Sequence, residues 1–126
     1  TAGVRELLNF GHTIGHALEA ATNFRYFRHG EAVLYGMRAA LALSKNRGLL
    51  GAAEYTRASA LLSRFALPPV PRSARFADIA RLLRYDKKMR ASKNVFVLLR
   101  GIGRPVRVSD VTRAELRLAM AEGGIL

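Results

Sequence analysis

The chain has 126 residues, enough for one domain that buries its own core. Half of the residues are hydrophobic and 24% are charged, which is too apolar for a disordered chain; with no cysteine, disulfides and thiolate zinc sites are excluded. The formal net charge of +12 permits an anionic partner, and no run of residues approaches the roughly 20 apolar positions of a membrane span, so we expect a cytoplasmic protein without membrane association.

Three helices are expected in the first half of the chain. Apolar residues recur at helical spacing across residues 3–21, 31–46 and 52–65. The second of these segments has so little polar surface that it should lie at the centre of the domain. Gly48 can end it as a C-cap, and the aromatic and basic segment 23–30 predicts a loop before it.

The second half of the chain predicts shorter elements. Prolines after residue 67 end the third helix, and Ser73 can cap a short fourth helix that ends near residue 83 or 84. Segments 95–99 and 106–108 flank two glycines, a pattern typical of a small hairpin. A last helix is expected over 113–121, capped by Asp110 or Thr112. The predicted fold is therefore mainly α, a helical domain with a small β-hairpin.

The histidines of the chain all fall within residues 12–29. His12 and His16 are four residues apart and share one face of the predicted helix 3–21. Neutral imidazole suits Zn²⁺, Fe²⁺ or Co²⁺, although the HExxH motif of helical zinc proteases is absent because Thr13 follows His12. The same face carries further polar side chains at spacings of four and three residues, namely Arg5, Asn9 and Glu19.

Each of these features also has a plain structural interpretation. A histidine pair on a helix is more often a solvated surface pair, and His29 can be an ordinary loop residue. Gly11 and Gly15 each lower the stability of a helix interior by about 1 kcal/mol relative to alanine. Their presence suggests that another group approaches the backbone closely at these positions. The approaching group is either a ligand or another helix. Taken together on one face, the polar residues favour a functional site.

A basic stretch offers an alternative function. Residues 81–107 contain nine lysines and arginines and a single acid, Asp86, which suits a non-catalytic helical domain that binds nucleic acid. No recognition-helix or RNP-like pattern accompanies this charge, and the histidine face has no role in such a protein. We therefore do not expect nucleic acid as a partner.

Three blocks of sequence resemble the 3-dehydroquinate synthase family, and they occur in the family's order. They are LNFGHTIGHALE at 8–19, HGEAVLYGM at 29–37, and DKK at 86–88 followed by VFVLL at 95–99. The resemblance implies the shikimate-pathway lyase reaction that converts 3-deoxy-arabino-heptulosonate 7-phosphate to 3-dehydroquinate and phosphate. It also implies zinc and NAD as cofactors. Related sugar-phosphate cyclases, such as 2-deoxy-scyllo-inosose synthase, share much of the pattern and form the nearest alternative.

The resemblance assigns roles to the histidines by matched position. It implies that His12 and His29 are ligands of a catalytic Zn²⁺ or Co²⁺, and that His16 handles a substrate hydroxyl proton. Glu19 and Glu31 would either orient histidines or form structural ion pairs.

The resemblance also assigns the groups that hold an anionic sugar-phosphate substrate. Arg5 and Asn9 would bind its carboxylate, hydroxyls or phosphate, and they favour the carboxylate-bearing substrate over that of the alternative cyclase. Lys88, or its neighbour Lys87, would contact phosphate.

The family's remaining parts are expected outside residues 1–126, which resemble its C-terminal metal- and substrate-binding domain. The third metal ligand is a glutamate from an upstream segment, and NAD lies on an upstream N-terminal domain; no glycine-rich dinucleotide loop occurs here. The chain begins at Thr1 without methionine, as a fragment or processed product would. We expect weak zinc binding and no turnover by the chain alone, and the family implies a homodimer.

Overall fold

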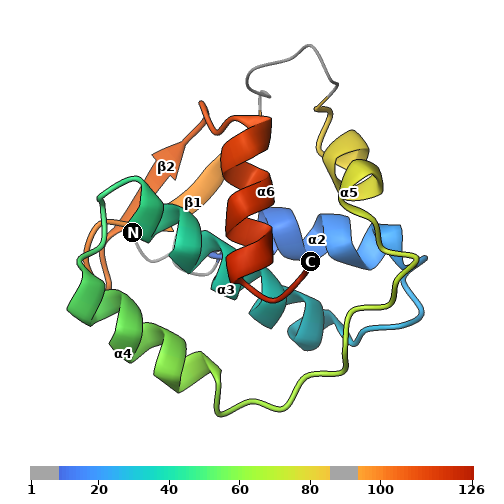
Figure 1. Cartoon of the computed structure of the whole chain (residues 1–126), viewed down its shortest axis with the longest axis horizontal. Helices are drawn as coiled ribbons and strands as arrows, with labels where there is room; N and C mark the ends of the chain where they lie inside the picture. Colours follow the sequence, from blue (N-terminus) through green and yellow to red (C-terminus); the bar gives the residue numbers. More distant parts are fainter. Residues whose placement is uncertain (1–8, 86–93) are drawn as a thin grey trace.

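The computed structural model describes residues 9–85 and 94–126. Its helices and strands, in chain order, are α2 (His12–Ala21), α3 (His29–Asn46), α4 (Ala52–Leu62), α5 (Phe76–Leu82), β1 (Phe96–Leu99), β2 (Pro105–Val108) and α6 (Arg113–Glu122) (Figure 1). The two strands form one antiparallel hairpin. This confirms the predicted helical domain with a small hairpin. Within the described ranges, no helix is long and apolar enough to cross a bilayer.

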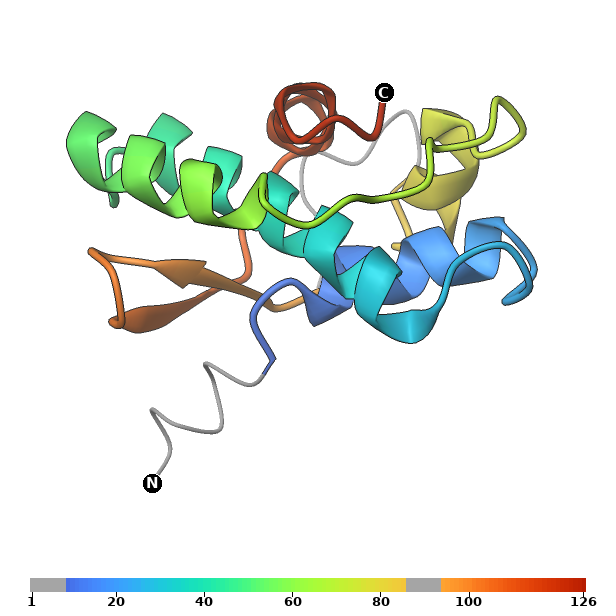
Figure 2. The same ribbon diagram turned by 90° about the horizontal axis from the view of Figure 1, so that it is seen from below.

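Helix α3 is the centre of the domain, as its sequence predicts. Nine of its 18 residues are buried, among them a continuous run from Ala39 to Ser44. Helices α2, α4 and α6 and strand β1 all pack against it. Figure 2 shows α6 on one side of α3, with α2 and the hairpin on the other. A helix that is covered from several sides exposes little surface to solvent, and this explains the apolar composition of α3.

Glycines let α2 and α3 cross with their backbones in contact. A Cβ atom on Gly36 would lie 2.0 Å from the carbonyl oxygen of Gly11, and one on Gly15 would lie 2.9 Å from that of Ala32. Gly11 also has a φ of +80°, in the left-handed region that glycine adopts without strain. Helix α3 is therefore the group that approaches Gly11 and Gly15, and helix packing accounts for both.

The first predicted helix is wrong over residues 9–11. These residues form a turn, and α2 begins only at His12, with Gly11 as its N-cap. The left-handed φ of Gly11 stops a helix from running through this point. The beginning of the predicted helix, residues 3–8, lies outside the described residues.

Other boundaries differ by small shifts. The predicted loop 23–30 is two residues shorter, because α3 already begins at His29, and the third helix ends at Leu62 instead of residue 65. Ser73 does not cap α5; it lies in a turn, and Arg75 is the N-cap. Of the two cap candidates for α6, Thr112 is the cap, since its hydroxyl accepts a hydrogen bond from the Glu115 amide.

Two side-chain hydroxyls attach the hairpin to the helices. The buried Ser44 hydroxyl accepts a hydrogen bond from the Leu99 amide at 2.9 Å and donates one to the Ala40 carbonyl. The Thr13 hydroxyl donates to the Val95 carbonyl at 2.9 Å. Strand β1 is thereby held against both α2 and α3.

An ion pair between α3 and α6 makes the stability depend on pH. Arg47 donates two hydrogen bonds to the Glu115 carboxylate, at 2.8 and 3.1 Å. Burial alone would raise the pKa of Glu115, but hydrogen bonds from Arg47 and from the Thr112 backbone outweigh it and lower that pKa below its ordinary value of 4.5. Folding therefore favours the charged carboxylate, so this stabilisation is complete above about pH 4.5 and is lost as the pH falls through the lower folded-state pKa.

We expect Glu115→Gln to be less stable than the parent by about 1 kcal/mol at pH 7, with the difference shrinking as the pH is lowered below 4.5 and through the folded-state pKa of Glu115. Thermal melts of both proteins across this pH range measure the effect. A difference that stays constant with pH would contradict the assigned ion pair.

Candidate functional site

His12 and His29 face each other although 17 positions separate them in the sequence. His12 is the first residue of α2 and His29 the first residue of α3. Because the two helices cross through their glycines, these helix starts come together, and the two imidazole centroids lie 5.7 Å apart with the rings inclined at 61°. Two rings at this separation can direct nitrogens at one ion.

Glu19 holds the ring of His29. Its carboxylate Oε1 lies 2.8 Å from Nδ1 of His29, and the Glu19 side chain is only 12% exposed, against 63% for His29. A carboxylate on one ring nitrogen fixes the orientation of a metal-binding histidine and leaves Nε2 free. Glu31, by contrast, orients no histidine: it accepts a hydrogen bond from the Arg28 amide at 2.7 Å and caps α3.

His12 carries a buried ring nitrogen that lacks a hydrogen-bond partner among the described residues. This atom is Nδ1. Leaving a buried nitrogen unpaired costs about 1–3 kcal/mol, a cost that a metal ion or a ligand donor would remove. The donor set therefore fits a metal that prefers imidazole. It is incomplete, because residues 9–85 and 94–126 contain no group of three or more potential ligands.

His16 lies one helical turn after His12 and is exposed. Its ring meets the edge of Phe24, with the two centroids 6.0 Å apart. Phe24 and its neighbour Asn23 both have left-handed φ angles, 57° and 59°, and the Phe24 amide donates to the Glu19 carbonyl at the end of α2. This strained turn places the aromatic ring beside His16. The sequence offered no spacing that would have identified Phe24.

The predicted polar face is only partly a helix face. His12, His16 and Glu19 belong to α2, whereas Asn9 is an exposed residue of the preceding turn. The Asn9 carbonyl accepts a hydrogen bond from the His12 amide at 3.0 Å, so Asn9 lies beside the start of α2 all the same. Arg5, Lys87 and Lys88 lie outside the described residues.

Comparison with known proteins points to one family. The family model described as 3-dehydroquinate synthase C-terminal matches residues 1–89. A 3-dehydroquinate synthase of Dichelobacter nodosus is 48% identical over 120 residues, covering 94% of this chain and 32% of the relative. One of Corynebacterium pseudotuberculosis is 41% identical over 127 residues, covering 98% and 35%. The chain thus spans about a third of the length of these relatives.

Two solved cyclase structures have a similar fold. The 2-epi-5-epi-valiolone synthase of Streptomyces hygroscopicus, with NAD⁺ and Zn²⁺ bound, has a TM-score of 0.70 and 30% identity, covering 91% of this chain and 32% of that one. A 2-deoxy-scyllo-inosose synthase in complex with carbaglucose-6-phosphate, NAD⁺ and Co²⁺ has a TM-score of 0.73 and 26% identity, covering 90% and 32%.

Proposed function

The chain belongs to the 3-dehydroquinate synthase family, and we propose that it forms the C-terminal metal- and substrate-binding domain of such an enzyme. The reaction we propose is the conversion of 3-deoxy-arabino-heptulosonate 7-phosphate to 3-dehydroquinate and phosphate. The observation that carries the proposal is the facing pair His12 and His29, with Glu19 bonded to the second ring.

We propose His12 and His29 as two ligands of a Zn²⁺ or Co²⁺ ion. Such an ion, when bound, supplies a Lewis acid that polarises a substrate oxygen. Support comes from Nδ1 of His12, which lacks a partner among the described residues, and from the Glu19 bond, which holds His29 through Nδ1 and not through Nε2. The structurally similar cyclases were solved with Zn²⁺ or Co²⁺. A third ligand would come from outside this chain, so the pair alone should bind weakly.

We propose His16 as the group that accepts and returns a substrate hydroxyl proton. One helical turn separates it from His12, so both can reach one substrate molecule at the metal. Contact with Phe24 restricts the ring on one side while the rest stays accessible. Proton transfer needs this combination of a held ring and an open approach.

Substrate binding is assigned to polar groups around the start of α2. Asn9 can hydrogen-bond hydroxyls beside His12, because its carbonyl accepts a hydrogen bond from the His12 amide and so keeps Asn9 next to that end of the helix. Arg5 and Lys88, which lie outside the described residues, are proposed to hold the carboxylate and phosphate. The net charge of +12 draws such an anion towards the protein.

The remaining machinery is proposed to lie on an upstream NAD-binding domain, as the length of the relatives suggests. NAD supplies the hydride acceptor and donor when bound, and the upstream domain would also bring the carboxylate ligand. The partners proposed for this chain are therefore that domain, the sugar phosphate and, in the complete enzyme, a second copy. The alternative is another sugar-phosphate cyclase, which the structural similarity to 2-deoxy-scyllo-inosose synthase keeps open.

A chimaera tests the proposed reaction. It joins the upstream two-thirds of the Dichelobacter nodosus relative to this chain, and dehydroquinate and phosphate release are measured with the heptulosonate phosphate. We expect turnover by the chimaera and none by the isolated chain. A steady rate from the isolated chain would contradict the domain assignment. Turnover only with glucose 6-phosphate, whose carba analogue is bound in the 2-deoxy-scyllo-inosose synthase structure, would favour the alternative cyclase.

A further inference from the structure

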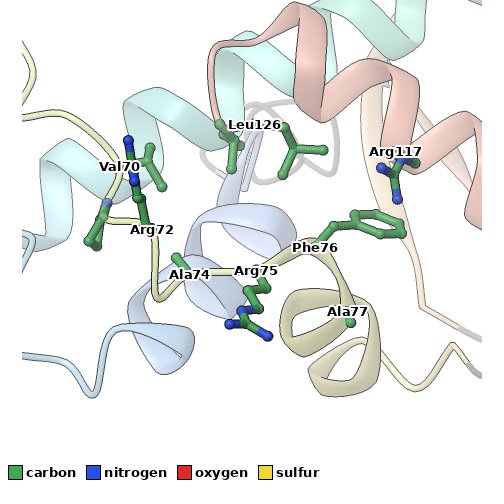
Figure 3. Close-up of a pocket in the computed structure, with 10 residues that line it drawn as sticks. Val70, Arg72, Ala74, Arg75, Phe76, Ala77, Arg117 and Leu126 are labelled. Atoms are coloured by element: carbon green, nitrogen blue, oxygen red, sulfur yellow. The ribbon is translucent and has the colours of Figure 1, made fainter.

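A surface depression unrelated to the histidines lies between the segment before α5 and the C-terminal end of the chain (Figure 3). It has a volume of about 510 Å³ and is open to solvent. Apolar side chains form its floor, among them Val70, Ala74, Ile125 and Leu126. Leu126 remains 48% exposed, so this apolar surface is only partly covered within the chain.

Three arginines line this depression without matching acids. Arg72, Arg75 and Arg117 are all exposed, and across residues 9–85 and 94–126 none of them forms an ion pair, whereas Arg47 and Arg81 do. No aspartate or glutamate side chain belongs to the lining. Figure 3 shows Arg72 and Arg117 at opposite ends, with Arg75 between them.

Phe76 holds one end of this arginine set in place. The guanidinium carbons of Arg113 and Arg117, one turn apart on α6, lie 4.9 and 5.3 Å from the centroid of its buried ring. Stacking on an aromatic ring orients a guanidinium and leaves its N–H edge free for an acceptor. The Nε of Arg113 is buried and has no partner among the described residues. A held arginine loses less entropy when it binds an anion.

We propose that this depression is a docking site for an acidic segment of a partner protein, with apolar side chains set between its carboxylates. Arginines spread along the depression match carboxylates spaced along a chain better than one small anion, which would need them to converge. Because the depression is open to solvent, it does not enclose a small molecule, but its apolar floor can take side chains of a peptide. The site uses no residue of the proposed metal centre.

Fluorescence anisotropy tests the proposal on the chain itself. The probe is a short labelled peptide of alternating glutamate and leucine, and a glutamate–serine peptide is its control. The triple variant Arg72→Gln/Arg75→Gln/Arg117→Gln should bind the probe about tenfold more weakly than the parent. Arg57→Gln/Arg64→Gln/Arg104→Gln removes the same charge from exposed arginines elsewhere and should change binding less than about threefold. The single variant Arg72→Gln, far from the Phe76 stack, should still weaken binding if the triple variant fails to fold.

Each other outcome overturns the proposal. An equal loss of affinity for the probe in both triple variants would mean that the peptide is attracted to the cationic surface in general. Equal binding of the two peptides would mean that the apolar floor takes no part. Tighter binding of a short DNA duplex, lost in the same triple variant, would make the face a nucleic-acid surface. A concentration-dependent dimer in sedimentation, abolished by that variant, would make it a contact between copies.

Discussion

Replacing Gly36 with alanine is expected to lower the free energy of unfolding by more than about 3 kcal/mol. The added Cβ would lie 2.0 Å from the Gly11 carbonyl oxygen and 2.7 Å from the Gly15 amide nitrogen, both backbone atoms. Neither can rotate away, so α2 and α3 would have to separate at the crossing that holds His12 and His29 together. Chemical denaturation followed by circular dichroism measures the loss.

Gly30→Ala is the matched control on the same helix. A Cβ there meets nothing within 4 Å, and this glycine has an ordinary negative φ. Its replacement should leave the stability unchanged or raise it by up to about 1 kcal/mol, because alanine is the better helix former. Equal destabilisation by the two substitutions would show that the crossing is less tight than the structure indicates.

Removing either facing histidine is expected to abolish metal binding by the chain. Calorimetry at pH 7.5, with Zn²⁺ or Co²⁺ as the probe, should give weak binding in the parent and none in His12→Ala or His29→Ala, since a single imidazole cannot hold the ion. Glu19→Gln should weaken binding about 10–100-fold, because an amide holds the His29 ring less firmly than a carboxylate.

His16→Ala is the control for this experiment. His16 is exposed and is proposed to move protons, so its loss should leave the affinity for the metal unchanged. Binding that survives in both His12→Ala and His29→Ala would place the metal elsewhere. No binding to the parent chain would show that two imidazoles alone are insufficient. The same titrations on the chimaera would then test the metal site. If the chimaera and its His12→Ala form bound the metal with equal affinity, the assignment of His12 as a ligand would be overturned.

The local elements were predictable because their signals are local. Thr112 and Glu115 lie three positions apart, the spacing of a capping box, and both hydrogen bonds of that box are present. The glycines at 101 and 103 mark the hairpin, and both have left-handed φ angles. The start of α2 was not predictable in this way. The apolar spacing gives no sign of a break at residue 11, whereas in the structure Gly11 is left-handed and lies so close to α3 that a Cβ would be 2.6 Å from the Met37 amide nitrogen.

The candidate site was also predictable only in part. The residue types were visible in the sequence: three histidines within 18 positions, in a motif that resembles a known family, together with the net charge of +12. Only the tertiary structure decided that His12 faces His29, that Glu19 bonds the second ring while Glu31 caps a helix, and that Phe24 lies against His16. Spacing along a chain reports periodicity within one element, but the contacts of His29 with His12 and Glu19 join two different helices. Their distances depend on how closely two helices approach, and here glycines without side chains set that approach.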